Sequence, residues 1–221
     1  MPHSQTITIV AFGDSITHAG HQALADRWPE ILGHALRERF PECGLTVINA
    51  GVGGNTSREG LRRMEKDVLA HAPHFVLAEF GNDATTDSER HVSFEEFTAN
   101  LDRIKTAVEA KGQGRLILLT FPPIVDQWHA KYQDEFYKRN GGQDVYQGNY
   151  RQLTRQFASA HGVPLAEIDL ALRKEMSAHG PERYILKDGV HLTAQGNRVV
   201  AGVVLEVLSA EIRVILAKSL F

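Results

Sequence analysis

Three polar side chains that could cooperate in nucleophilic catalysis stand out in this sequence. Ser15 comes directly after the apolar run ITIVAF and Gly13-Asp14, and its hydroxyl is a candidate nucleophile. A serine nucleophile requires a base that takes its proton and a group that orients this base. His191 is the candidate base, because a neutral imidazole accepts a proton near pH 7. Asp188 lies three residues earlier, so one short turn can carry both the carboxylate and the imidazole.

Donors for a developing oxyanion are also present. Gly53 and Gly54, in GVGGNTS, leave backbone N–H groups open to close approach, because glycine has no Cβ. Asn82, in the GND segment at 81–83, carries a side-chain amide that donates hydrogen bonds. Together with the N–H of Ser15, these groups predict an oxyanion site.

Each of these residues also has an ordinary structural interpretation. A serine after a strand often caps a helix, and His191 could cap a last helix that follows Thr193. Asp169, in EIDLA, is a rival for the orienting acid, although we interpret it as a helix cap. Asp14 fits a structural role as an acceptor of backbone N–H bonds in its turn. The GVGGNTS segment could bind phosphate, but it lacks the lysine of a P-loop.

The sequence favours no metal and no cofactor. The single cysteine, Cys43, excludes an internal disulfide and a multi-cysteine metal site. His71 and His74 have the spacing of metal ligands, but they precede an apolar run and no carboxylate motif supports zinc. His18 and His21 flank the Ser15 turn, and we expect them at the edge of a pocket. Of these two, His18 is the residue to test for a substrate contact.

Five short apolar runs predict the strands that position these groups. Each run is rich in Val, Ile and Leu, and its apolar residues are nearly continuous rather than alternating. This pattern is typical of strands that are buried on both faces. The runs are residues 7–12, 45–50, 74–80, 115–121 and 163–169.

Segments with helical periodicity separate these runs, which predicts a parallel sheet with helices on both faces. Ligands of such sheets bind beyond the carboxyl ends of the strands. Ser15, the two glycines and Asn82 follow three of the runs, and Asp188–His191 follows the fifth run late in the chain. The predicted helices are residues 23–40, 57–71, 93–110, 149–160 and 193–218, with a shorter one over 170–176.

Residues 122–148 are too long for a simple connection between two elements. Connections of this length in a compact domain are usually functional or contain short helices. Their aromatic residues predict either a lid over the pocket or a small core at the surface. These residues are Trp128, His129, Tyr132, Phe136, Tyr137 and Tyr146. We predict a single domain over residues 1–221 that contains this insertion.

Composition restricts the partners of the protein. The 221 residues carry a net charge of −3, so no basic field attracts nucleic acid or an anionic membrane. No apolar run is long enough to span a bilayer, and the N-terminal residues do not read as a signal peptide, so we expect a cytoplasmic protein. The C-terminal helix has an excess of apolar residues, which leaves room for a homo-oligomeric contact.

Four motifs resemble those of the SGNH, or GDSL, hydrolase superfamily. They are GDSIT at 13–17, NAGVGGNTS at 49–57, GND at 81–83 and DGVHLTAQGN at 188–197, and they come in that family's order. The resemblance implies a flavodoxin-like, three-layer α/β/α sandwich and ester hydrolysis through an acyl-enzyme. The chain departs from the family pattern at Phe80, where a glycine usually stands two residues before the asparagine.

By motif position, the resemblance assigns a role to each candidate residue. Ser15 matches the nucleophile, His191 matches the base and Asp188 matches the acid. The N–H groups of Ser15 and Gly54 and the side-chain amide of Asn82 match the oxyanion hole.

We expect the substrate to be a small-molecule ester. The insertion mixes aromatic residues with charged ones such as Lys131 and Asp126, which suits a polar alcohol better than a lipid tail. The prediction is a serine esterase for short-chain, acetyl-type esters of a carbohydrate or another small polar alcohol. A lysophospholipase or thioesterase is the alternative enzyme. A non-catalytic, anion-binding module on the same fold is the alternative of another class.

Overall fold

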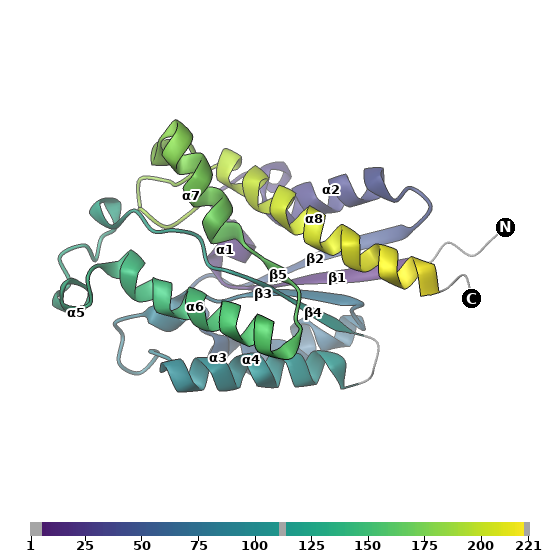
Figure 1. Ribbon diagram of the computed structural model, residues 1–221, viewed down its shortest axis with the longest axis horizontal. Helices are drawn as coiled ribbons and strands as arrows, with labels where there is room; N and C mark the ends of the chain where they lie inside the picture. Colours follow the sequence, from purple (N-terminus) through teal and green to yellow (C-terminus); the bar gives the residue numbers. More distant parts are fainter. Residues whose placement is uncertain (1–5, 111–113, 219–221) are drawn as a thin grey trace.

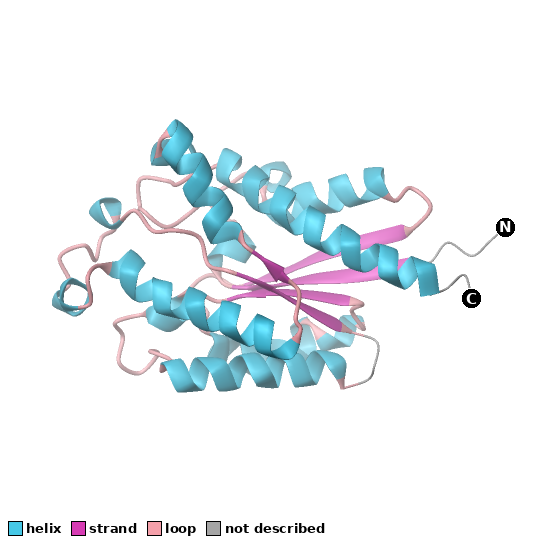
Figure 2. Cartoon of the chain, in the orientation of Figure 1, coloured by secondary structure: helices cyan, strands magenta, loops and turns pink. Residues whose placement is uncertain are grey.

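The computed structural model describes residues 6–110 and 114–218 of the chain, and Figures 1 and 2 show its arrangement. Five strands form one parallel sheet in the order β2-β1-β3-β4-β5. They are β1 (Thr6–Gly13), β2 (Gly44–Gly51), β3 (Phe75–Glu79), β4 (Arg115–Leu119) and β5 (Leu165–Ala166). The predicted five-stranded parallel sheet is confirmed.

The fifth strand is shorter than its apolar run. Only Leu165 and Ala166 pair with β4, whereas the predicted strand covered residues 163–169. Pro164 has no N–H to donate to a neighbouring strand, and Ile168 already begins the next helix. The Asp188–His191 segment therefore does not follow this strand directly, because helix α7 lies between them.

Helices cover both faces of the sheet and form the predicted three layers. In Figure 1, α2, α7 and α8 lie above the sheet, and α3, α4 and α6 lie below it. The long helices are α2 (Trp28–Arg39), α3 (Ser57–Asp67), α4 (Phe94–Glu109), α6 (Gln143–His161), α7 (Ile168–His179) and α8 (Ala194–Lys218). Two short ones are α1 (Ser15–His18) and α5 (Glu135–Arg139), and 3-10 turns include η3 (Asn82–Ala84) and η4 (Asp126–Trp128).

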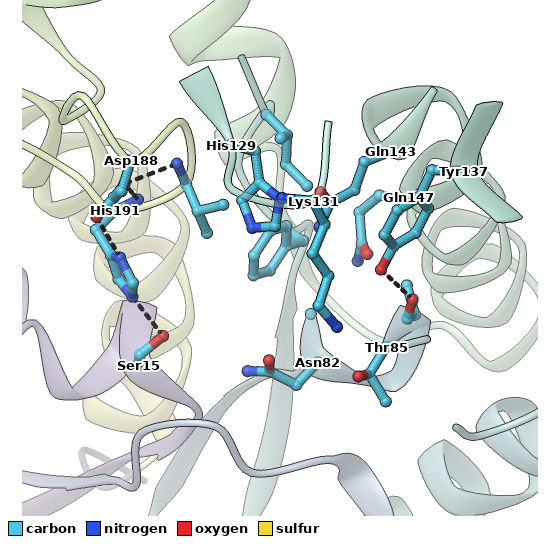
Figure 3. A pocket seen from close by; sticks show the side chains of 15 residues that line it. Ser15, Asn82, Thr85, His129, Lys131, Tyr137, Gln143, Gln147, Asp188 and His191 are labelled. Atoms are coloured by element: carbon cyan, nitrogen blue, oxygen red, sulfur yellow. Dashed lines mark hydrogen bonds and ion pairs between the residues drawn. The ribbon is translucent and has the colours of Figure 1, made fainter. Parts of the chain in front are cut away.

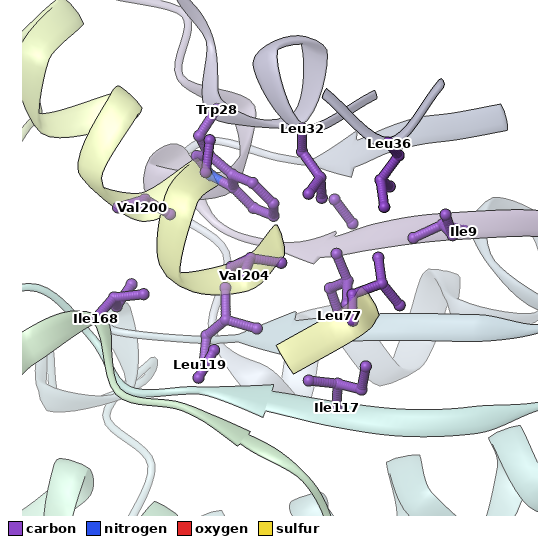
Figure 4. Packing of buried hydrophobic residues seen from close by; sticks show 14 of the residues in the cluster. Ile9, Trp28, Leu32, Leu36, Leu77, Ile117, Leu119, Ile168, Val200 and Val204 are labelled. Carbon is purple, nitrogen blue, oxygen red and sulfur yellow. The ribbon is translucent and has the colours of Figure 1, made fainter. Parts of the chain in front are cut away.

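Alternate residues of each strand pack into two separate cores. Ile9 and Leu77 face the α2–α8 side, where they pack with Trp28 and Val204 (Figure 4). Val10 and Val76, the next residues along these strands, face the other side with Ile104 of α4. Burial on both faces explains why the runs are continuously apolar instead of alternating.

The insertion ends earlier than predicted. Helix α6 begins at Gln143 rather than at residue 149, so the irregular part of the segment stops at Gly142, which has a φ of 111°. A hydrogen bond from Asp144 N to Asp126 Oδ1 holds this helix start against η4. Phe136, Tyr137 and Tyr146 contact one another ring to ring, as a small aromatic core does. A lid function of the segment stays a prediction.

The ends of the chain bear on two further predictions. Residues 1–5, on which part of the signal-peptide prediction depends, lie outside the described residues. Among the helices of residues 6–110 and 114–218, none combines the length and the apolar character that a membrane span requires. Most apolar residues of α8 pack on the core, whereas Val214 is exposed.

Candidate active site

Ser15 is the first residue of α1, at the carboxyl end of strand β1. The turn before it is held by Asp14, whose Oδ1 accepts a hydrogen bond from the N–H of Ile16 at 2.8 Å. Asp14 is completely buried, so its carboxylate acts inside the turn, as the sequence predicted. Ser15 itself is partly exposed, which leaves its hydroxyl open to a ligand.

The structure brings Ser15, His191 and Asp188 together in one hydrogen-bonded chain, as Figure 3 shows. His191 Nε2 lies 2.9 Å from Ser15 Oγ, and His191 Nδ1 lies 2.8 Å from Asp188 Oδ2. The other oxygen of Asp188 accepts hydrogen bonds from the N–H groups of Val190 and His191. Partial burial opposes ionisation of Asp188, but these N–H groups and the imidazole lower its pKa. An ionised Asp188 keeps the proton of the neutral imidazole on Nδ1 and leaves Nε2 free to accept one.

The segments that carry the predicted oxyanion donors Gly54 and Asn82 lie near Ser15. Gly54 has a φ of +76°, a conformation that favours glycine, and a Cβ at Gly53 would lie 3.9 Å from the Cβ of Ser15. Asn82 begins η3, and its side-chain Nδ2 donates to Asp14 Oδ2 at 3.0 Å. An amide nitrogen carries two hydrogens, so the second one is available to a ligand. In Figure 3 this amide points toward Ser15.

The structure explains why Phe80 can replace the glycine of the family pattern. Phe80 is buried and packs edge to face on Phe12, with the ring centroids 5.1 Å apart. The close approach occurs one residue later, because a Cβ at Gly81 would lie 1.9 Å from the ring of Phe121. The N–H of Gly81 donates to Asp14 Oδ2 at 2.9 Å, so Asp14 holds the backbone that carries Asn82.

A second buried carboxyl group, Glu79, lies beside Asp14 beneath the nucleophile turn. Burial, together with the charge of Asp14, raises the pKa of Glu79 well above its usual range. Its Oε1 accepts a hydrogen bond from Thr17 Oγ1 at 2.7 Å. Burial raises the pKa of Asp14 as well, but its N–H donors oppose this rise, so the site favours the neutral form at Glu79 rather than at Asp14. Glu79 lies inside an apolar run of the sequence, so no local pattern distinguished it.

A cavity of about 200 Å³ opens next to Ser15, Asn82 and His191. Its wall includes Phe121, Ile124 and Tyr137, and its polar lining comes from Thr85, His129, Lys131, Gln143 and Gln147 (Figure 3). Among the described protein groups, the buried Nε2 of Gln147 and Oε1 of Gln143 have no hydrogen-bond partner. Buried polar atoms are normally paired, so the amide side chains of Gln143 and Gln147, which line the cavity, keep hydrogen-bonding capacity.

The two glutamines were missed because the predicted helix began too late. Gln143 and Gln147 are four residues apart and therefore share one face of α6. A helix that began at residue 149 excluded both of them. The irregular segment is bounded by the prolines at 122 and 123 and by the glycines at 141 and 142. The two glycines were the sequence signal for a helix that starts before residue 149.

Asp169 does not have the predicted role of a helix cap. Glu167 occupies the N-cap position of α7, and Asp169 lies in the first turn. Its nearly buried carboxylate pairs with Arg155 at 2.9 Å and with Arg173 at 2.7 Å. Because both carboxylate oxygens form ion pairs with these arginines, Asp169 belongs to an ion-pair cluster and not to the His191 site.

The remaining histidines occupy different positions. His18 and His21 are both exposed, and neither lines the 200 Å³ cavity. The ring of His21 lies against that of His191, with the centroids 3.9 Å apart. Partial burial, followed by the charge of His191, lowers the pKa of His21. His74 Nδ1 accepts a hydrogen bond from the N–H of Thr8, which is a structural role.

The chain is similar to known proteins in sequence and in fold. Residues 11–199 match the model of the GDSL-like Lipase/Acylhydrolase family. An acetylxylan esterase from Geobacillus stearothermophilus is 26% identical over 212 residues, which cover 87% of this chain and 90% of that protein. The crystal structure of Axe2, an acetylxylan esterase from that organism, has a TM-score of 0.74 and 25% identity, and the match covers 93% of this chain and 95% of Axe2. The Bacillus subtilis protein "Uncharacterized lipoprotein YqeF" is 28% identical over 214 residues, covering 87% of this chain and 85% of that protein.

Proposed function

The chain belongs to the GDSL-like lipase/acylhydrolase family of ester hydrolases, and we propose that it removes short acyl groups of the acetyl type from a carbohydrate or another small polar alcohol. The predicted resemblance to GDSL hydrolases is confirmed by the family match. The carboxylic ester hydrolase activity is common to the family and to its named esterase relatives.

One observation carries the proposed mechanism: the unbroken hydrogen-bonded chain from Ser15 Oγ through His191 to Asp188. Ser15 attacks the ester carbonyl while His191 Nε2 takes the hydroxyl proton. Asp188 keeps the imidazole in this orientation and stabilises the imidazolium. His191 then donates the proton to the departing alcohol, and water attacks the acyl-enzyme to release the acid.

The oxyanion of the tetrahedral intermediate needs donors that are in place before the reaction. In our proposal, the N–H groups of Ser15 and Gly54 and the free amide hydrogen of Asn82 supply them. The buried carboxylate of Asp14 restrains the Asn82 amide and therefore keeps it aimed at this position.

The size and polarity of the cavity support a small polar substrate. Its volume of about 200 Å³ is below the roughly 300–1,000 Å³ of sites that enclose drug-sized ligands. A long acyl chain requires a continuous apolar groove, whereas this cavity contains Lys131 and the unpaired amide atoms of Gln143 and Gln147. Hydroxyl groups both donate and accept hydrogen bonds, so they suit these amides. The relative from Geobacillus stearothermophilus is named for an acetylated carbohydrate.

Two experiments test the proposal. A serine-directed fluorophosphonate should label the chain stoichiometrically at Ser15, and the Ser15→Ala variant should remain unlabelled. If phosphate stabilises the fold against unfolding and the reagent does not label Ser15, the anion-binding alternative is favoured. In a panel of p-nitrophenyl esters from two to twelve carbons, kcat/KM should be highest for the shortest acyl groups. Activity that rises with chain length would favour the lysophospholipase or thioesterase alternative.

The role of the glutamines can be tested separately. The Gln147→Leu variant removes the unpaired buried amide without changing the Ser15–His191–Asp188 chain. We expect kcat/KM for acetylated sugars to fall more than kcat/KM for p-nitrophenyl acetate. Equal losses on both substrates would contradict the assignment of Gln147 to a polar subsite.

The cytoplasmic location also stays a proposal. One relative carries the name of a lipoprotein, so the location of the full-length protein has to be measured. Fractionation of cells that express the natural gene, followed by detection of the protein, distinguishes a cytoplasmic from a membrane-attached form.

A further inference from the structure

Three side chains beside the nucleophile have the composition of a transition-metal site. His21, Asp188 and His191 each offer one ligand atom, and these atoms lie within 4.8 Å of one another. In the part of the chain that the structure describes, no other three histidine, cysteine or acidic side chains come together in this way. His21 and Asp188 are exposed, so a metal ion from solution can reach them.

We propose that His21, Asp188 and His191 form an inhibitory site for Zn²⁺ or a similar divalent transition metal. Imidazole nitrogens and carboxylate oxygens are common zinc ligands, at about 2.0–2.2 Å from the metal. Two ligand atoms at that distance in a tetrahedral site are roughly 3.3 Å apart. The ligand atoms lie within 4.8 Å of one another, so binding requires rotation of the exposed His21 and Asp188 side chains, and a water molecule would complete the coordination.

The inhibition follows from the tautomer of His191. Asp188 faces Nδ1, so the metal enters between these two groups and binds the Nδ1 lone pair. A neutral imidazole has one N–H proton, which now resides on Nε2 instead of Nδ1. Nε2 then faces Ser15 Oγ with a proton already bound, and it accepts none from the hydroxyl. The imidazole stays neutral, and its single proton has moved from one ring nitrogen to the other.

His21 supplies the third ligand, which the His–Asp pair of a serine hydrolase does not provide by itself. Two ligands alone hold Zn²⁺ weakly, and a third protein ligand is the minimum of most catalytic zinc sites. The ring of His21 already lies 3.9 Å, centroid to centroid, from that of His191. Hard cations such as Mg²⁺ prefer oxygen ligands and should not inhibit. This inference rests on the proposed function only for the role of His191 as base.

The inhibition test uses p-nitrophenyl acetate in a buffer that does not chelate metals. Micromolar Zn²⁺ should reduce the activity of the wild type, and EDTA should restore it. The His21→Gln variant should require at least about tenfold more Zn²⁺ for half inhibition, each variant being compared with its own metal-free rate. His18→Gln is the matched control, because His18 is an exposed histidine on the same turn but outside the cluster. Equal sensitivity of the His21→Gln variant and the wild type would overturn the proposal.

A binding measurement keeps this test independent of catalysis. Calorimetric titration should show one Zn²⁺ per chain in the wild type and in the Ser15→Ala variant, with the affinity lowered in the His21→Gln variant. Absence of binding, or unchanged binding in the His21→Gln variant, contradicts the metal site. A Ser15→Ala variant that kept its esterase activity would contradict the proposed function and leave the zinc titration to decide the metal site.

Discussion

Single hydrogen bonds at the active site connect residues that come from different elements. Ser15 begins a one-turn helix, His191 and Asp188 lie in the segment that leads into α8, and Asn82 begins a 3-10 turn after β3. Asp14 joins two of these regions, since its two oxygens accept hydrogen bonds from Ile16 on one side and from Gly81 and Asn82 on the other. The proposed chemistry therefore depends on individual side chains, and single substitutions can separate their roles.

Removal of the proposed nucleophile or base should nearly abolish turnover. We expect Ser15→Ala or His191→Ala to lower kcat by about four to six orders of magnitude, as in serine hydrolases with a disabled triad. Asp188→Ala should lower kcat less than His191→Ala does, because the imidazole still accepts a proton without its orienting partner. Steady-state kinetics with p-nitrophenyl acetate measures these losses. A larger loss of kcat in Asp169→Asn than in Asp188→Asn would show that the wrong acid has been assigned.

Loss of the Asn82 amide should affect the transition state more than substrate binding. The oxyanion forms only during the reaction, so Asn82→Ala should lower kcat by about two to three orders of magnitude with little change in KM. Thr85→Ala, at the same cavity, serves as a control that leaves the oxyanion donors in place. A decrease of kcat/KM that comes mainly from KM would contradict the assigned role of Asn82.

At the level of elements, buried polar groups hold the helices that surround the site. Asp83, at η3, accepts a hydrogen bond from the N–H of Ser57 at the start of α3, at 2.7 Å. Arg151 of α6 donates to the carbonyl oxygens of Phe121 and Pro122, which lie just after β4. These contacts fix the positions of α3 and α6 relative to the carboxyl end of the sheet, where the cavity opens.

Asp83 should make the stability of the fold depend on pH. Burial raises its pKa to about 7 from 3.8, so the folded protein binds this proton more tightly than the unfolded chain. The stabilisation is fully present below about pH 4 and is lost as the pH rises through about 7. Asp83→Asn stays neutral and keeps an acceptor for Ser57. Between pH 4 and pH 8, the free energy of unfolding of the wild type should therefore fall relative to this variant by a few kcal/mol, at about 1.4 kcal/mol per pKa unit.

Urea unfolding at several pH values measures this difference. Asp102→Asn, at an exposed position of α4, is the matched control and should follow the wild type at every pH. Parallel pH profiles of the wild type and the Asp83→Asn variant would show that Asp83 does not carry this dependence.

Arg151 should contribute strongly to stability because it is buried with its partners. Its side chain is only 2% exposed and pairs with Asp144 at 2.7 Å and with Asp169 at 3.4 Å. Arg151→Met leaves these carboxylates and two buried carbonyl groups short of a donor, which we expect to cost about 3–5 kcal/mol. The exposed pair of Arg198 and Asp26 provides the control, since Arg198→Met should cost less than about 1 kcal/mol in the same urea titration. Similar losses in both variants would contradict a special role of the buried cluster.

At the scale of the whole molecule, the first and last parts of the chain share one core. Trp28 of α2 packs with Val200 and Val204 of α8, and β1 lies inside the sheet between β2 and β3 (Figures 1 and 4). Because residues from both parts of the chain build this core, we expect them to fold together, and the single domain over residues 1–221 stays a prediction. Whether α8 also forms a homo-oligomeric contact stays a prediction that light scattering in solution can decide.

Such a shared core should unfold as one unit. We expect a single calorimetric transition and loss of esterase activity within it, because Ser15 and His191 come from the first and the last part of the chain and this shared core holds both parts together. A parallel assay of residual activity and circular dichroism during heating measures both. Activity that disappears well before the helices melt would show that the site unfolds separately from the domain.

Local patterns in the chain were sufficient to predict most of the fold. The five apolar runs and their spacing predicted a parallel sheet with two helical layers, because burial on both faces requires continuous apolar strands. The errors lie where tertiary contacts override local preference. Strand β5 pairs through only two residues, and α6 starts at Gln143, where the side chain of Asp126 holds the first turn. Arg173 lies four residues after Asp169 in the same helix, but the ion-pair partner Arg155 comes from α6, which no local pattern reports.

The candidate site divides in the same way. The types and order of Ser15, Asn82, Asp188 and His191 were sufficient to name the chemistry, because few residue types act as nucleophile, base and oxyanion donor. The sequence did not show that these side chains come together, because Ser15 and His191 are 176 residues apart in the chain. Packing of α8 on the sheet brings His191 Nε2 to 2.9 Å from Ser15 Oγ. The neutral Glu79, the unpaired Gln147 and the ring of His21 against His191 also appear only in three dimensions. Burial and proximity are properties of the folded chain, and they decide the charge of a carboxyl group and the availability of an amide.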